Sequence, residues 1–307
     1  MKKLTLVILA AALTLLLTCC AAYDPVKRIG ESRYKSIVVI GVDGGGAFFN
    51  EGDALTDDFK AFFSTADSHL GVTDCLCETP SISAQNWGAY LHGTRPEKIE
   101  VNNFRVGTVR FTDRRYPSVF QVIHDVDPSC TLASICHWSP INYGLIETSA
   151  GVYKDPDIRF SSGLYSDGEV VTRVKAYAKD NSPDLLFVHL DDCDAAGHSH
   201  GYGSPEHIEA LHTTQGRCLD IFSAFDPETT LFIVISDHGG TPEGTHGGDT
   251  PAEMHITFAI RGKGLDPAAL DNFTFRPRDL SPIILTAMGI EVPSCMEGVC
   301  PTGLFKD

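Results

Sequence analysis

The sequence predicts an α/β domain, a three-layer α/β/α sandwich with a mostly parallel central sheet between two layers of helices. Three observations predict this fold class. Apolar, β-branched runs alternate with helical segments along the chain, which is the pattern of βαβ units. Several runs are continuously apolar, as strands buried on both faces are. No internal repeat or low-complexity linker divides the chain, so we expect one catalytic domain over residues 35–307.

The first half of the domain opens with a strand. Ser36–Asp43 is a continuous β-branched run, typical of a strand buried on both faces. A helix follows at 53–63, and another at 83–91 is opened by Pro80 and a serine cap. This half is completed by a helix at 118–126 and a strand at 131–136.

The second half repeats the alternation. A helix at 169–179 carries apolar residues at helical spacing. The strand at 230–236 is the most apolar of all. The remaining elements are strands at 184–190 and 255–261, a long helix at 205–225 and a closing helix at 280–288.

The composition is globular and acidic. The chain has 307 residues, of which 43% are hydrophobic and 21% charged, which excludes a disordered tail, a fibre and a coiled coil. A net charge of −16 argues against binding of a nucleic-acid duplex, because such binding needs a basic surface. Small phosphate substrates are not excluded, since bound metal can supply positive charge.

The N-terminus has the features of an export signal. Two lysines precede an apolar run at 4–17 that is too short to span a bilayer comfortably. Since Cys19 and Cys20 follow, we interpret residues 1–20 as a lipoprotein-type signal peptide and 21–34 as a linker. A plain secretory signal and an uncleaved anchor are the alternatives. We expect an exported protein, either lipid-anchored on the outer face of a bacterial cytoplasmic membrane or secreted or periplasmic.

Export also permits disulfides. Eight of the ten cysteines lie beyond Cys19 and Cys20. Cys295 and Cys300 flank a turn-sized loop and are the local pair that we expect to bond.

Polar side chains collect where the predicted strands end, which is where ligands bind in open α/β sheets. The candidate ligands are Asp43 after the first strand, Asp194 and His198 after the strand at 184–190, Asp237 and His238 after the strand at 230–236, and His246 in the next loop. A lone aspartate after a strand is usually a turn or cap residue, but three such sites with adjacent histidines indicate a metal centre. Carboxylates combined with imidazoles suit Zn²⁺ or a similar transition metal better than Mg²⁺ or Ca²⁺.

Ser83 is the candidate nucleophile. It opens the helix at 83–91, where unpaired N–H groups and the helix dipole favour an anion. A metal-bound hydroxyl there can lose its proton and attack phosphorus. The alternative is a serine that only caps the helix. The glycines within 41–46 indicate a tight turn close to the metal rather than a nucleotide-binding loop, because the motif lacks the lysine of a P-loop.

Together these motifs resemble the alkaline phosphatase superfamily, most closely its nucleotide pyrophosphatase/phosphodiesterase branch. The motifs occur in the family's order across residues 36–262. They are the strand ending at Asp43-Gly, Ser83-x-x-Asn86 with Gly93-Thr-Arg-Pro96, Asp194-x-x-x-His198, Ser236-Asp237-His238-Gly239, and His246-Gly247. The resemblance implies an alkaline-phosphatase-like fold and two divalent metal ions, with zinc first among them. It also implies hydrolysis of a small phosphate ester or nucleotide-type substrate.

The same resemblance implies roles for individual residues. One metal would be held by Asp194, His198 and His246. The other would be held by Asp43, Asp237 and His238, with Ser83 between this metal and the substrate. Asn86 would hold a non-bridging phosphoryl oxygen.

Several alternatives stay open. A phosphomonoesterase or a phosphonate or sulfate ester hydrolase would use a similar site, and a metal-binding surface lipoprotein would use no chemistry. We favour diesters, because the helix of Ser83 offers neutral Asn86 and the first cation downstream is Arg95. Four further histidines are interpreted as packing or surface residues: His189, His200, His207 and His212. Two aromatic residues, Trp138 and Tyr143, are interpreted as either pocket-lining or core residues.

Overall fold

A seven-stranded sheet forms the centre of the computed structural model, which describes residues 23–71, 74–108, 110–111, 113–155 and 166–306. The strand order is β2-β7-β6-β1-β5-β3-β4. The strands are β1 (Ser36–Val42), β2 (Ser68–Gly71), β3 (Leu132–Cys136), β4 (Tyr153–Lys154), β5 (Leu185–Leu190), β6 (Thr230–Ser236) and β7 (Phe258–Arg261). Within the described residues all pairings are parallel except those of β7 with β6 and β2. The predicted mostly parallel sheet is confirmed.

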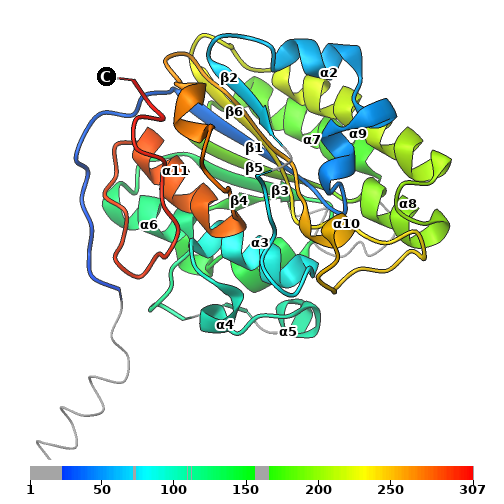
Figure 1. Cartoon of the computed structure of the whole chain (residues 1–307). Helices are drawn as coiled ribbons and strands as arrows, with labels where there is room; N and C mark the ends of the chain where they lie inside the picture. The colour runs from blue at the N-terminus through cyan, green and yellow to red at the C-terminus, as the bar shows by residue number, and fades with distance from the viewer. Residues whose placement is uncertain (1–22, 72–73, 109, 112, 156–165, 307) are drawn as a thin grey trace, which may run out of the picture.

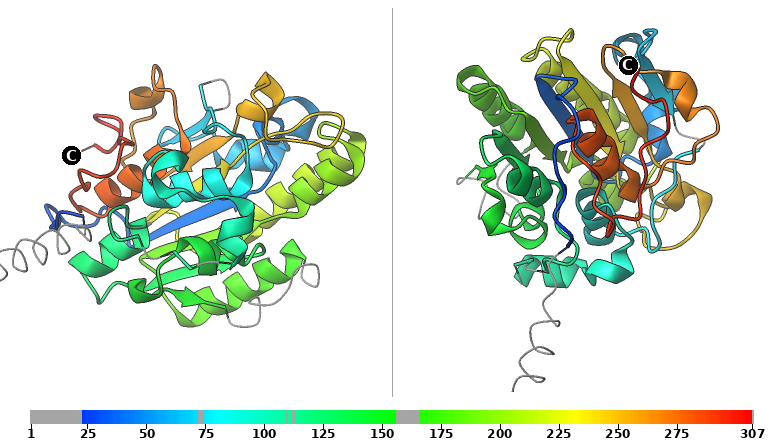
Figure 2. Two further views of the ribbon diagram at one scale, coloured as in Figure 1. Left: turned by 90° about the horizontal axis from the view of Figure 1, so that it is seen from below. Right: turned by 90° about the vertical axis from the view of Figure 1, so that its left-hand side faces the viewer.

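Helices cover both faces of the sheet and complete the three layers (Figures 1 and 2). One layer contains α3 (Ser83–His92), α6 (Val119–Val126) and α11 (Leu280–Ala287). The other contains α2 (Asp57–Phe62), α7 (Asp167–Asp180) and α9 (Pro205–Phe222), with α8 (Asp192–His200) packed on α9. Short helices are α4 (Pro96–Ile99), α5 (Asn103–Thr108) and α10 (Pro251–Met254), and single 3₁₀ or π turns lie at Ala47–Asn50, Gly52–Ala54, Ile141–Leu145, Thr148–Ala150, Pro267–Leu270 and Pro277–Asp279.

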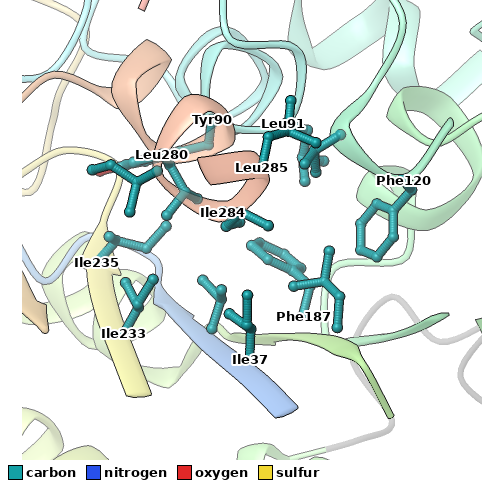
Figure 3. Packing of buried hydrophobic residues seen from close by; sticks show 14 of the residues in the cluster. Ile37, Tyr90, Leu91, Phe120, Phe187, Ile233, Ile235, Leu280, Ile284 and Leu285 are labelled. Atoms are coloured by element: carbon teal, nitrogen blue, oxygen red, sulfur yellow. The ribbon is translucent and has the colours of Figure 1, made fainter. Parts of the chain in front are cut away.

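Strand periodicity divides the core between the two helical layers. Alternate residues of β1 point to opposite faces, so Ile37 and Val39 join one apolar cluster and Val38 and Ile40 join the other. Figure 3 shows Ile37 and strand residues of β5 and β6 facing side chains of α3, α6 and α11. Burial on both faces explains why these strands read as continuous apolar runs.

Several elements differ from the sequence-based expectation. The helix expected at 53–63 is a 3₁₀ turn followed by α2, because Thr56 caps α2 by accepting the N–H of Phe59. The strand expected at 255–261 begins only at Phe258 and runs antiparallel. Helix α8 was not expected, since its residues carry almost no apolar periodicity.

The remaining sequence-based predictions about the fold concern the cysteines and the N-terminal segment. The eight described cysteines are all unbonded, so the expected Cys295–Cys300 disulfide is absent. The predicted signal peptide lies outside the described residues. The segment from Tyr23 onward lies along the domain surface, where the Tyr23 hydroxyl donates to Asp125 and Arg28 pairs with Asp127 (Figure 2). Among the described residues, none of the helices combines the length and apolar character needed to cross a membrane.

Candidate metal centre

Three neighbouring strands bring the candidate ligands to one edge of the sheet. β5, β1 and β6 are adjacent and parallel, so their carboxyl ends meet. Asp43 follows β1, and Asp237 and His238 follow β6. Helix α8 starts directly after β5 and places Asp194 and His198 four residues apart on one helix face.

Asp194, His198 and His246 form what we call the outer group. Their ligand atoms all lie within 4.8 Å of one another. His198 Nε2 is 3.3 Å from Asp194 Oδ2 and 3.2 Å from His246 Nε2. The His198 side chain is 47% exposed, so this group is open to solvent. The grouping is the one that the sequence predicted for one metal.

Asp43, Asp237 and His238 form what we call the inner group, which is fully buried. His238 Nε2 lies 3.3 Å from Asp237 Oδ2 and 3.5 Å from Asp43 Oδ1. The ligand atoms of Asp43 and His238 also lie within 4.8 Å of Asp194, so the two groups adjoin through that carboxylate. All six predicted ligands are therefore brought together.

The three histidines are held in the tautomer that suits a metal. Each Nδ1 lies within hydrogen-bond distance of a backbone carbonyl, which can only accept, so each Nδ1 carries its proton. The contacts are His198 to Gly244 O at 2.8 Å, His246 to Ser81 O at 2.9 Å and His238 to Gly239 O at 2.8 Å. Each Nε2 is thus the atom that faces the carboxylates and can offer a lone pair.

The charge balance of the inner group calls for a cation. Burial, together with the charges of Asp43 and Asp194, raises the pKa of Asp237 well above its usual value. Asp237 Oδ2 is buried without a hydrogen-bond partner in the described part of the chain. Burial and the charge of Asp43 also raise the pKa of Asp191 to about 7. Because unpaired buried carboxylates are costly, these residues fit divalent metal ions.

For Asp43 and His198, in contrast, the surrounding groups favour the charged form. Although burial opposes its ionisation, the hydrogen bond from His189 and the charges of His189 and His238 lower the pKa of Asp43. The hydrogen bond to Asp194 raises the pKa of His198 to about 9. A proton and a metal ion therefore compete for the same nitrogen of His198.

Ser83 faces the inner group. Its Oγ lies 3.2 Å from His238 Nε2 and 3.5 Å from Asp43 Oδ1. The residue preceding it, Ile82, occupies the N-cap position of α3, so Ser83 is the first helical residue and its hydroxyl caps nothing. The capping alternative is therefore wrong. The next backbone N–H, that of Ala84, donates to Asn103 Oδ1 at 2.9 Å.

The amide of Asn86 is engaged with the backbone before Ser83. It is fully buried, and its Oδ1 accepts the N–H of Glu78 at 2.7 Å. Its Nδ2 donates to the carbonyls of Pro80 and Ile82 at 3.2 and 3.1 Å. These contacts hold the segment that leads into Ser83, and they use the amide that the sequence assigned to a phosphoryl oxygen.

Three residues that contact the ligands were missed or interpreted differently from the sequence. His189, interpreted as a packing or surface residue, and Trp87 both contact Asp43. The Tyr202 hydroxyl donates to Asp194 Oδ1 at 2.5 Å. Asp43 and His189 fall on the same face at the same end of paired strands, a relation set by the register of β5 against β1 that the sequence alone does not give.

The remaining polar candidates lie elsewhere. His200 is exposed, His212 is half-buried, and His207 is buried against Tyr202. His137, Asp167 and Asp192 also group closely. Asp167, however, accepts the N–H groups of residues 191 and 192 and pairs with His137 and Arg217, so that group is already satisfied and holds the start of α8.

Three of the relatives found by sequence match between about two fifths and about two thirds of the chain. It is 34% identical over 222 residues to GPI ethanolamine phosphate transferase 3 of Schizosaccharomyces pombe, a match that covers 70% of this chain and 23% of that protein. It is 30% identical over 128 residues to a 2,3-bisphosphoglycerate-independent phosphoglycerate mutase of Clostridium perfringens, covering 38% and 23%. A third relative, mouse GPI ethanolamine phosphate transferase 1, is 29% identical over 152 residues, covering 40% and 16%. The chain spans less than a quarter of the length of each of these proteins.

Solved structures share the fold at low identity. Murine ectonucleotide pyrophosphatase/phosphodiesterase 5 superposes with a TM-score of 0.64 at 11% identity, covering 87% of this chain and 97% of that chain. The 2-O GAG sulfatase BT1596 gives 0.63 at 12% identity, covering 87% and 73%. The periplasmic domain of the Campylobacter jejuni phosphoethanolamine transferase EptC gives 0.59 at 11% identity, covering 87% and 92%. The predicted alkaline-phosphatase-like fold is confirmed.

The family itself follows from the model that matches most of the chain. The model described as type I phosphodiesterase / nucleotide pyrophosphatase matches residues 37–255, a range that includes both ligand groups and Ser83. The chain belongs to the type I phosphodiesterase/nucleotide pyrophosphatase family.

Proposed function

We propose that this chain is an exported phosphodiesterase of the nucleotide pyrophosphatase type, which holds two divalent ions and uses Ser83 as its nucleophile. One observation carries the proposal. Three histidines with fixed Nδ1–H tautomers and three carboxylates converge beside the hydroxyl of a serine at a helix N-terminus.

The two groups would hold one ion each. Asp194, His198 and His246 suit the first, and Asp43, Asp237 and His238 suit the second, with Ser83 beside it. Mixed imidazole and carboxylate donors favour zinc. Such ions, when bound, neutralise charge on phosphoryl oxygens and favour the deprotonated form of a nearby hydroxyl.

Ser83 supplies the attacking oxygen. The Ser83 Oγ–phosphorus bond forms as the bond from phosphorus to the leaving oxygen breaks, and the leaving group departs with its electron pair. The hydroxyl proton of Ser83 is directed toward Asp43 Oδ1 or His238 Nε2, its two neighbours. Water then cleaves the phosphoseryl ester and returns the serine. The N-terminus of α3 favours the anionic phosphoryl group throughout.

Asn103 takes the substrate-binding role that the sequence gave to Asn86. Its Oδ1 is fixed by the Ala84 N–H beside Ser83, and its Nδ2 has no hydrogen-bond partner among the described residues. An amide fixed by its oxygen presents its N–H₂ group as a neutral donor for a phosphoryl oxygen.

Charge around the site favours diesters. Of the five arginines from Arg95 to Arg115, Arg110 is exposed and the other four are engaged with carboxylates outside the metal centre: Arg95 with Glu297, Arg105 with Glu100, Arg114 with Asp125 and Arg115 with Asp113. A monoester dianion gains most from an arginine clamp, which these pairings do not supply. A diester or pyrophosphate linkage carries less charge on the attacked phosphorus and suits a neutral donor better.

Export and lipid anchoring belong to this proposal. The supporting features are the basic and apolar start of the chain and the adjacent Cys19 and Cys20. Replacing both cysteines by alanine should move the protein from the membrane fraction to the soluble fraction of the exporting cell. Retention in the membrane fraction would contradict a lipid anchor.

Transfer to an organic hydroxyl is a second candidate. The observation that favours it is the match over 70% of this chain to a GPI ethanolamine phosphate transferase. The covalent step at Ser83 would be the same, with an alcohol replacing water in the second step. Product analysis with glycerol or ethanolamine in the reaction separates the two, because only transfer yields a new phosphodiester or phosphoalcohol.

The decisive test compares substrates and variants of the zinc-loaded protein. We expect a higher kcat/KM for bis(p-nitrophenyl) phosphate than for p-nitrophenyl phosphate. Ser83→Ala should lower kcat by about 10³-fold or more while the fold survives, since Ser83 caps nothing. Ser83→Thr should keep measurable turnover. Near wild-type turnover of Ser83→Ala would contradict the serine mechanism, and a clear advantage for the monoester would favour a phosphatase.

A further inference from the structure

Two side chains outside the ligand groups hold one oxygen of Asp43. His189 Nε2 lies 2.9 Å from Asp43 Oδ2, and Trp87 Nε1 donates to the same oxygen at 3.0 Å. Both side chains are fully buried. The other oxygen, Oδ1, is left to face Ser83 and His238, each at 3.5 Å. Oδ2 of Asp43 is thus fixed by two hydrogen bonds, while Oδ1 faces the candidate metal site.

The backbone fixes which nitrogen of His189 carries the proton. The N–H of Trp138 donates to His189 Nδ1 at 3.3 Å, and an amide N–H cannot accept. Nδ1 is therefore the acceptor and Nε2 carries the hydrogen that Asp43 receives. Because both ring nitrogens are engaged, His189 is a donor to a ligand rather than a ligand itself.

The sheet is shaped to seat these two donors. Gly41 of β1 pairs in register with His189 of β5, two residues before Asp43 on the same face. A Cβ at position 41 would lie 2.5 Å from the Trp87 ring, so only glycine leaves room for the indole there. The rings of Trp87 and His189 pack edge to face, with centroids 5.1 Å apart.

We infer that His189 and Trp87 are positioning residues that lock the Asp43 carboxylate and so set the metal affinity of the inner group. The inference rests on the proposed two-ion centre. Each donor removes rotational freedom from Asp43 and stabilises its ionised form. Outer partners of this kind change metal affinity by about 10- to 100-fold when they are removed.

The test measures zinc affinity in the full protein by competition with a chromogenic chelator, together with the d–d spectrum of the cobalt-substituted protein. His189→Leu and Trp87→Phe each remove one donor, and Trp87→Phe keeps an aromatic ring in the slot. His189→Gln keeps an N–H donor near the position of Nε2. His212→Gln is the matched control, because His212 is a half-buried residue of α9 outside both ligand groups, whose Nε2 lies within hydrogen-bond distance of the carbonyl of Asp53.

We expect His189→Leu and Trp87→Phe to weaken binding of one of two zinc ions by about 10- to 100-fold and to alter the cobalt spectrum. His189→Gln should restore most of the affinity, and His212→Gln should match the wild type. Trp87→Phe decides the question if His189→Leu does not fold. Wild-type affinity in both donor-free variants, or equal loss in His189→Gln and His189→Leu, would overturn the inference alone. A wild-type protein that binds no zinc would instead overturn the proposed metal centre.

Discussion

Gly41→Ala tests how tightly the fold supports Asp43. The added Cβ would lie 2.5 and 2.6 Å from two atoms of the Trp87 ring, well inside normal contact distance. The indole cannot swing away, because it is fully buried and donates to Asp43 Oδ2. Overpacking of this kind costs about 1–3 kcal/mol. That cost corresponds to a drop in Tm of about 2–4 °C per kcal/mol for a domain of this size.

The matched control is Gly216→Ala. Gly216 lies in α9, and a Cβ there would meet nothing within 4 Å. Alanine should therefore stabilise the helix by about 0.5–1 kcal/mol. Thermal unfolding and zinc affinity of both variants form the assay, and we expect opposite signs of the Tm shift and weaker zinc binding only for Gly41→Ala. If Gly41→Ala melted at or above the wild-type temperature, the reasoning about the Trp87 slot would be refuted.

Three further predictions concern the ligands and the substrate. Tyr202→Phe removes the hydroxyl that donates to Asp194 and should weaken zinc binding to the outer group by about 10-fold or more in chelator competition, whereas unchanged affinity would show that the contact does not matter. Hydrogen bonding to Asp194 raises the pKa of His198 to about 9, and zinc needs the deprotonated imidazole, so zinc affinity at the outer group should rise with pH up to about 9. The readout is the number of protons released into weakly buffered solution when zinc binds. A flat affinity profile from pH 6 to 9 would contradict this prediction. Asn103→Ala should lower kcat/KM with little change in Tm, while Asn86→Ala should lower Tm first, and the reverse pattern would restore Asn86 as the substrate contact.

The sequence predicted the sheet and the convergence of the candidate ligands, because both depend on local or strictly periodic features. Continuous apolar runs identified β1 and β6, and residues directly after strand ends must share one edge of a parallel sheet. Helix α8 was not predicted, because its residues are mostly polar and form no apolar stripe at helical spacing.

The contacts that orient side chains could not be read in the same way. Asn86 lies on α3 and Asn103 on α5. Asn103 contacts the start of α3 only because the chain between the two helices folds back, which is a property of tertiary packing. His189 looked like a core histidine because its strand is apolar, and only the register of β5 against β1 brings it to Asp43.

Metal analysis of the purified protein tests the central claim most directly. After zinc loading and removal of loosely bound metal, we expect close to two zinc ions per wild-type chain. His198→Ala and His246→Ala should each keep close to one, because the inner group does not include these residues. A folded wild-type protein that never holds more than a small fraction of an ion would contradict the account, and so would variants that still hold two.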